Sequence, residues 1–339
     1  MKPRLLPDTR LLPSDRGVVI SGPQRTAAFA LPGIHPWLER LRPFLDGRSS
    51  LDQLTSDLPP QAAQHVRSLV ELLAREGFVR DATADLPHGL SPQVRARYAA
   101  LIDFIAARAD SPEHRFERYR DCAPLVVGTG RMASALVLAL LASGVAHVRL
   151  RLRTVEEGSG DPTDVARLRE CVALLRQEGG CFRYQQLSGN LSGPPADAGV
   201  VLLGSDVYET EPADQARALA IRAGVPYGQA VGRGAHIVIS TVGDPGATPE
   251  PPASCVPPGN GRDHPAAGAA RAGDPARVRE PSPYLGGPVA ALAANQLCLH
   301  LLRRTAGLDN SGGGAAPSPV TDAEVLDLTT GRFLGAEPG

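Results

Sequence analysis

The chain has 339 residues, 42% of them apolar, and a formal net charge of −1, because 35 Lys and Arg stand against 36 Asp and Glu. This length predicts two domains with sizeable cores, and the balanced charge argues against general binding to nucleic acid. No apolar run approaches the roughly 20 residues of a membrane span, and the first residues lack the apolar stretch of a signal peptide. We therefore expect a cytoplasmic protein with no membrane and no nucleic-acid partner.

Cysteine and lysine usage excludes several kinds of site. The five cysteines are scattered without a C-x-x-C pair, which argues against a disulfide scaffold and makes a zinc site unexpected. Lys2 is the only lysine, and every other basic residue apart from histidine is arginine. A mechanism that needs an interior lysine, for a Schiff base or a phosphate contact, is therefore excluded. The histidines and serines show no pattern typical of nucleophilic catalysis.

Residues 1–82 predict a small winged-helix domain. Three short extended stretches come first, and the third covers residues 25–31. Apolar residues at helical spacing then predict helices over 34–46, 50–58 and 60–76. Ser50 is the expected N-cap of the second helix, and Gly77 ends the third helix before a short closing strand. Residues 83–121 predict a linker with one or two helices, around 91–109.

Residues 122–339 predict a second, α/β domain. Apolar strands alternate with amphipathic helices from 122 to 240, which is typical of a parallel sheet covered by helices. Residues 243–283 are rich in proline and poor in large apolar residues, so we expect a disordered loop there. A long helix over 289–307 and a final strand and turn complete the domain.

The strongest local signal is the turn between the first strand and the first helix of this domain. The sequence VVGTGRMASALVLALLASG (126–144) places Gly128 and Gly130 where backbone N–H groups and a helix N-terminus would face a phosphate. However, no acid ends the second strand, 147–153, to hold a ribose, since the first acid is Glu156. We therefore interpret Gly128, Gly130 and Arg131 as a vestigial nucleotide site.

A second candidate site lies in the first domain. The small side chains of the third extended stretch leave its backbone accessible, so that another peptide could add there as a strand. On the helix over 60–76, Leu72 lies off the main apolar stripe, beside His65 and Leu69. Leu72 either faces a groove between this helix and the strand or packs against the second domain.

The order of these parts resembles a known family. A winged-helix module precedes the turn V-V-G-T-G-R (126–131), and SPYLGGPVAALAANQLCLHLL (282–302) is similar to a late helix of the same group. That group is the ocin-ThiF-like leader-peptide-binding proteins, which are partners of YcaO cyclodehydratases in thiopeptide and related pathways. The resemblance implies an α/β protein with an N-terminal winged-helix (PqqD-like) domain followed by a Rossmann-like ThiF-type domain.

The resemblance also implies a function and a site. In the family, the leader of a ribosomally made precursor peptide adds as a strand beside the third strand and against the third helix. Carried over to this sequence, the peptide-binding residues are Arg25, Thr26, Ala27, Ala28, Phe29, Ala30, His65, Leu69 and Leu72. The second domain would dock the YcaO enzyme, which uses ATP to form azolines, so the chain itself is expected to be a non-catalytic subunit without a cofactor. ThiF-like domains often pair, so a homodimer is also expected.

Two alternatives stay open. ThiF-like adenylating enzymes carry an acid after the second strand, a phosphate-binding lysine and paired C-x-x-C zinc ligands, and here only Cys255 stands in the corresponding region. An ATP-dependent adenylating enzyme that acts on a peptide or carrier protein is the first alternative. The second is a winged-helix regulator that binds DNA. Apart from His65, however, the helix over 61–76 carries only two basic residues that could contact DNA, Arg67 and Arg75.

Overall fold

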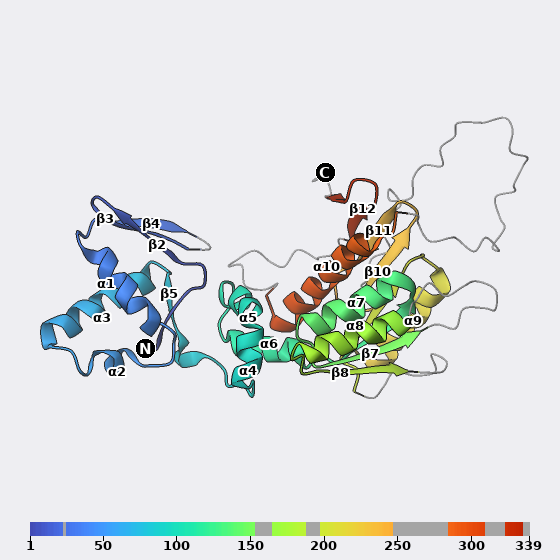
Figure 1. The fold of residues 1–339 in the computed structure, drawn as a ribbon, viewed down its shortest axis with the longest axis horizontal. Helices are drawn as coiled ribbons and strands as arrows, with labels where there is room; N and C mark the ends of the chain where they lie inside the picture. The colour runs from blue at the N-terminus through green and yellow to red at the C-terminus, as the bar shows by residue number, and fades with distance from the viewer. Residues whose placement is uncertain (23–24, 153–164, 188–196, 247–283, 309–322, 335–339) are drawn as a thin grey trace, which may run out of the picture. The chain divides into compact units, whose positions relative to one another are not determined.

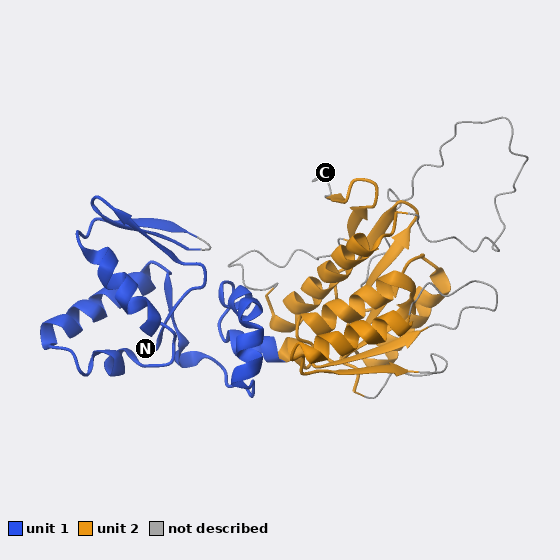
Figure 2. Ribbon diagram, in the orientation of Figure 1, with its two compact units in different colours: residues 1–117 blue, residues 118–339 orange. Residues whose placement is uncertain are grey.

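The computed structural model describes residues 1–22, 25–152, 165–187, 197–246, 284–308 and 323–334. The chain divides into two compact units, residues 1–117 (unit 1) and residues 118–339 (unit 2), shown in Figure 2. The predicted linker, 83–121, contains three helices rather than one or two. The predicted loop at 243–283 lies outside the described residues except for its first four positions.

Unit 1 contains five short strands and a series of helices (Figure 1). The strands are β1 (Pro3–Leu5), β2 (Arg10–Ser14), β3 (Gly17–Ser21), β4 (Thr26–Phe29) and β5 (Val79–Asp81). The α-helices are α1 (Ile34–Leu41), α2 (Leu51–Thr55), α3 (Pro60–Arg75), α4 (Pro92–Arg97), α5 (Ala99–Ala106) and α6 (Pro112–Arg120), the last of which continues into unit 2. Single 3₁₀ turns lie at η1 (Arg42–Phe44) and η2 (Ala82–Ala84).

The three helices predicted in residues 1–82 are present, although α2 is shorter than predicted, and the first predicted extended stretch divides into β1 and β2, which lie in different sheets. Ser50 caps α2 as predicted, because its side chain accepts the Gln53 N–H while the Gln53 side chain accepts the Ser50 N–H. Strands β2, β3 and β4 form an antiparallel sheet, and β1 pairs with β5. Apolar residues from the inner face of this sheet and from α1, α2 and α3 form one core, for example Ile20, Leu38 and Val70. The name winged helix for this arrangement stays a prediction.

Unit 2 contains a large mixed sheet. Its strands are β6 (Pro124–Thr129), β7 (His147–Leu152), β8 (Arg183–Leu187), β9 (Val200–Ser205), β10 (Tyr227–Arg233), β11 (His236–Ile239), β12 (Glu324–Asp327) and β13 (Arg332–Leu334). Its further helices are α7 (Gly130–Ala142), α8 (Val165–Gln177), α9 (Thr210–Ala223) and α10 (Gly287–Ala306). The predicted α/β domain with a mostly parallel sheet is confirmed.

The strand order of this sheet is β13-β12-β11-β10-β9-β6-β7-β8. Strands β8, β7, β6, β9 and β10 run parallel, whereas β10 to β13 pair antiparallel. The predicted parallel sheet is therefore present, and the antiparallel strands β11, β12 and β13 extend it beyond the prediction. Because the chain order turns from β6 toward β7 on one side and toward β9 on the other, the switch point of the topology lies between β6 and β9.

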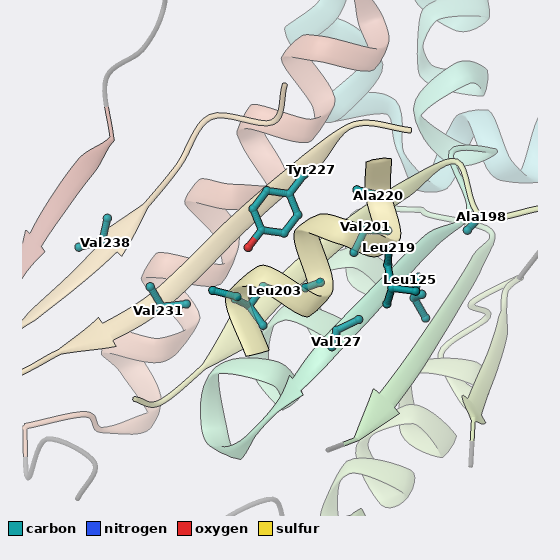
Figure 3. Close-up of a cluster of buried hydrophobic side chains, with 12 residues drawn as sticks. Leu125, Val127, Ala198, Val201, Leu203, Leu219, Ala220, Tyr227, Val231 and Val238 are labelled. Atoms are coloured by element: carbon teal, nitrogen blue, oxygen red, sulfur yellow. The ribbon is translucent and has the colours of Figure 1, made fainter. Parts of the chain in front are cut away.

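Helices cover both faces of the sheet. On one face, Ala216, Leu219 and other residues of α9 pack on apolar residues of β6, β9 and β10, as Figure 3 shows for Leu203, Tyr227 and their neighbours. On the other face, α7 and α10 lie side by side (Figure 1). There α7 approaches β9 so closely that a Cβ on Gly204 would lie 3.1 Å from the Cα of Ala133.

Candidate functional site

The free edge of β4 is the first candidate site. Among the described residues, β4 pairs only with β3, so its other edge has no strand partner. The N–H of Gly22 donates to the carbonyl of Arg25 at 2.8 Å, which makes these two residues a hydrogen-bonded pair of the hairpin. Because such pairs alternate along an antiparallel ladder, Ala27 and Phe29 direct their backbone groups toward β3, whereas Thr26 and Ala28 direct theirs outward.

Side chains hold β4 against the rest of unit 1. The guanidinium of Arg25 donates to the Glu76 carboxylate at the end of α3 at 2.8 Å. The rings of Phe29 and Phe78 meet edge to face with centroids 6.4 Å apart. Ala28 is exposed on the outer face of the sheet, and Ala30 is exposed beyond the end of the strand. The predicted site residues 25–30 therefore form an anchored strand with an accessible backbone edge.

An apolar groove of about 770 Å³ begins where β4 ends. It is lined by Leu31, Pro32, Ile34, Trp37, Arg40, Leu41, Phe44, Leu54, Leu58, His65, Val66, Ser68, Leu69 and Leu72. We call it the α1–α3 groove, because these two helices supply most of its lining. The predicted residues His65, Leu69 and Leu72 all line it. The structure thus brings the helix part of the predicted site together in one groove, whereas residues 25–30 lie along the strand before it.

The groove exposes large apolar side chains that sequence reasoning missed. Trp37 is 55% exposed and Phe44 is 57% exposed, and Leu31 and Leu58 are also among the exposed large apolar residues of the described chain. Trp37 lies next to the apolar stripe of its helix rather than on it, which is the signal that could have marked it. Of the described residues that line the groove, only Arg40 and His65 have titratable side chains, and both are exposed, so the groove is apolar with a basic rim.

The glycine turn of unit 2 is the second candidate site. Gly128, the last but one residue of β6, lies opposite Gly204 of β9, and a Cβ on Gly128 would lie 1.8 Å from the Gly204 carbonyl oxygen. Gly130 begins α7 with a φ of 81°. Because the turn lies at the carboxyl end of β6, beside the switch point, it has the position of a ligand-binding crevice in an open α/β sheet.

Asp206, which directly follows β9, occupies this turn. Its carboxylate accepts the N–H of Arg131 at 3.0 Å and the N–H of Met132 at 2.8 Å. The guanidinium of Arg131 donates to the carbonyl oxygen of Leu285 at 2.6 Å. As they stand, these residues do not fit a nucleotide phosphate, because a carboxylate already binds the helix N-terminus. Sequence reasoning looked for an acid after the second strand and missed this one after β9.

The other sequence-based expectations concern metals and membranes. Among the described residues, no group of three or more His, Cys, Asp and Glu side chains is placed to hold a metal ion. Cys255 lies outside these residues, so the expectation of no zinc site stays a prediction. In the described part of the chain, no helix combines the length and the apolar character that a membrane crossing requires.

No protein-family model matches the sequence, and no curated protein matches it. Solved structures nevertheless share the fold. E. coli MccB with ATP has a TM-score of 0.59 at 11% identity, over 98% of this chain and 96% of that one. The microcin C7 biosynthetic enzyme MccB in complex with N-formylated MccA has a TM-score of 0.58 at 11% identity, with the same coverage. PaaA has a TM-score of 0.59 at 15% identity, over 96% of this chain and 97% of that one.

These similarities correct one expectation. The family resemblance implied a non-catalytic subunit, and the absence of an interior lysine and of an acid after the second strand agreed with that expectation. That prediction was wrong, because nearly the whole chain has the fold of a protein that is a biosynthetic enzyme and has been solved with ATP. The missing side chains alone therefore do not decide whether a chain of this fold catalyses a reaction.

Proposed function

We propose that this protein works in the biosynthesis of a ribosomally made peptide natural product, and that unit 1 binds the leader of the precursor peptide. The free edge of β4 carries the proposal, because Thr26 and Ala28 present outward N–H and C=O groups to which a leader can add as a strand. The similarity to MccB supports it. MccB has been solved with N-formylated MccA and with MccA that carries isoasparagine at position 7, so the molecule bound to MccB in those structures is a peptide.

The leader would be held by two kinds of contact. Strand addition supplies backbone hydrogen bonds that depend little on the peptide sequence. Apolar side chains of the leader would then enter the α1–α3 groove, where Leu69, Leu72 and Trp37 offer apolar contact area. Specificity for one leader therefore comes from the groove and not from the strand edge.

We further propose that a YcaO cyclodehydratase modifies the core of the bound peptide. While the leader stays attached, the core residues remain at high effective concentration near the enzyme. The product would be azolines formed from Cys, Ser or Thr residues of the precursor, with one water lost at each ring. Assays of this chain alone, the YcaO enzyme alone and both together, read by mass spectrometry, show which of the two proteins is needed for each ring.

The strand-addition site is tested by Ala28→Pro in the full chain. Proline removes the outward N–H of residue 28, yet an edge strand tolerates proline at a position whose N–H faces solvent. Ala28→Thr is the matched control, because it keeps this N–H and favours a strand. The probe is a fluorescein-labelled leader from a candidate precursor, a short peptide rich in Cys, Ser and Thr, and its binding is measured by fluorescence polarisation.

We expect Ala28→Pro to weaken leader binding by roughly tenfold or more, since a backbone hydrogen bond is lost and the ring obstructs the paired strand. Ala28→Thr should bind like the parent protein. Equal affinity of Ala28→Pro and the parent would place the peptide elsewhere. The single tryptophan, Trp37, gives a second readout, because a ligand in the groove changes its fluorescence.

A further inference from the structure

We propose that the α1–α3 groove recognises a leader segment that carries a carboxylate beside apolar side chains, and that Arg40 determines this preference. The inference rests on the proposed function and specifies the chemistry of the peptide that unit 1 would bind. Arg40 lies three residues after Trp37 on α1, so the two side chains share one side of the helix, and both line the groove.

The two walls of the groove offer apolar contact area and no negative charge. Trp37 and Phe44 lie on one wall and are mostly exposed, and Leu69 and Leu72 lie on the other wall at helical spacing on α3. A ligand between these walls would remove their apolar surface from water, which favours binding. Among the described residues of the lining, no Asp or Glu is present to repel a carboxylate.

Arg40 is available to a ligand, because its guanidinium has no carboxylate partner. In residues 1–22 and 25–80, the arginines that form no ion pair with a carboxylate are Arg16, Arg40 and Arg75, and of these only Arg40 lines the groove. The neighbouring acid on α1, Glu39, approaches the Arg42 guanidinium at 3.7 Å instead. An unpaired arginine at the rim of an apolar groove favours an anionic group in the ligand.

The other polar groups of the lining agree with this preference. His65 and Ser68 lie on α3, opposite the α1 wall, and both are exposed. Imidazole and hydroxyl groups can each donate a hydrogen bond, as can the indole N–H of Trp37. With Arg40, all the polar side chains of the lining are therefore able to donate to a carboxylate oxygen.

The neighbourhood of the groove favours a peptide over other anions. Leu31 and Pro32, which line its beginning, directly follow β4, where Thr26 and Ala28 present outward backbone groups. A peptide can pair with this edge and also place side chains in the groove, whereas a lipid carboxylate has no backbone to pair. Nucleic acid needs several phosphate contacts, and the lining contains a single arginine.

Apolar contact would supply most of the affinity, and Arg40 most of the selectivity. An exposed ion pair increases affinity only a few fold, because water screens both charges. A basic leader residue in the same place would be repelled by Arg40, and such repulsion between like charges discriminates strongly between ligands. Reversing the charge at position 40 should therefore reverse the preference.

Selection from a phage-displayed library of random peptides tests this preference without a known leader. The full chain is immobilised as the parent, as Arg40→Glu and as Arg16→Glu. The last is the matched control, because Arg16 is exposed in the turn between β2 and β3, has no carboxylate partner and does not line the groove. Circular dichroism verifies that each variant is folded.

We expect the parent and Arg16→Glu to enrich peptides with Asp or Glu beside apolar residues, and Arg40→Glu to enrich Lys or Arg in that place. The proposal is overturned if the parent enriches no acidic residue, or if Arg40→Glu enriches acids as the parent does. A selected peptide that leaves the fluorescence of Trp37 unchanged would bind outside the groove and would also contradict the proposal.

A fluorescein-labelled peptide from the parent selection then gives affinities by fluorescence polarisation. We expect Arg40→Ala to bind it roughly threefold more weakly than the parent and Arg40→Glu roughly tenfold more weakly. Changing the acidic residue of the peptide to lysine should restore affinity for Arg40→Glu and reduce it for the parent. Added salt should weaken the parent more than Arg40→Ala. A lysine peptide that Arg40→Glu does not favour would overturn the proposal.

Two further results separate this inference from other accounts. If Ala28→Pro weakens binding of the candidate leader while Arg40→Glu does not, strand addition stands and the preference for a carboxylate falls. If the library shows the preference but Ala28→Pro binds the leader like the parent, the proposed strand-addition site falls instead. A dimer that Arg40→Glu dissociates in sedimentation would assign the groove to a second copy of this chain and overturn the inference.

Discussion

Leu72 is a residue of the candidate site that could be identified from its position on the helix alone. It is half-buried, lies off the main apolar stripe of α3, and lines the α1–α3 groove together with Leu69. A leucine in this position contacts a ligand without being needed for the core, in contrast to Val70 and Leu73, which are fully buried. Helical periodicity therefore identified a groove residue, but it could not identify the opposite wall on α1.

Replacing Leu72 with aspartate places a charge in an apolar groove, where it would be poorly solvated once a ligand is bound. We expect Leu72→Asp to weaken leader binding by roughly tenfold or more, with little change in the unfolding midpoint of the free protein. Glu71→Gln is the control, because Glu71 is exposed on the same helix and does not line the groove. Equal loss of affinity in both variants would mean that the groove is not the site.

Gly130 and Gly234 separate backbone strain from steric conflict. Both have positive φ angles, 81° and 61°, but a Cβ on Gly130 meets Asp206 whereas a Cβ on Gly234 meets nothing within 4 Å. We expect Gly234→Ala to lower the free energy of unfolding by about 1 kcal/mol through strain alone, and Gly130→Ala by roughly 2–4 kcal/mol. Urea denaturation measures the free energy of unfolding of both variants. A similar decrease in both would show that the Asp206 side chain can move aside to make room for the Cβ.

At the scale of secondary structure, Asp81 joins the first strand of unit 1 to the last. Its carboxylate accepts the Thr83 hydroxyl at 2.6 Å and the backbone N–H of Lys2 at 2.8 Å. These hydrogen bonds, first that of Thr83 and then that of Lys2, lower the pKa of Asp81 from 3.8 to about 2. The contact stabilises the pairing of β1 with β5 only while the carboxylate is ionised.

Because the pKa is lower in the folded state, this stabilisation is present above pH 3.8 and is lost as the pH falls through about 2. We expect Asp81→Asn to be less stable than the parent at neutral pH, and the difference to shrink between pH 4 and pH 2. Denaturation of unit 1 at several pH values, followed by circular dichroism, measures it. A difference that is constant over this range would exclude Asp81 as the titrating group.

The helices of residues 1–82 could be predicted because their apolar stripes and caps are local features, as Ser50 and Gly77 show. Strand β10 could not, since its sequence YGQAVGR has two glycines and a glutamine where apolar residues are expected. Packing explains these residues: a Cβ on Gly228 would meet Val242 at 2.9 Å, and a Cβ on Gly232 would meet the backbone of Asp206. Tertiary packing here overrides β propensity.

At the scale of the whole chain, the sequence indicated two domains and located both candidate sites in part. Residues 25–30 and Leu72 were accessible to sequence reasoning, because a short strand and a helix stripe are each visible locally. Asp206 was not, because its place at the glycine turn depends on β9 lying beside β6, and the paired residues of these strands, such as Gly128 and Gly204, are 76 residues apart along the chain. The expected lack of catalysis was inferred from a few local residues. The structural comparisons corrected it because they use the fold of nearly the whole chain.

Backbone hydrogen exchange, resolved by residue in the full chain with and without the leader peptide, tests strand addition to β4 most directly. A peptide on the free edge should slow exchange at the amides of Thr26 and Ala28 and leave Ala27 nearly unchanged, since the Ala27 N–H already bonds to β3. Leader binding with no added protection at Thr26 and Ala28 would contradict the account.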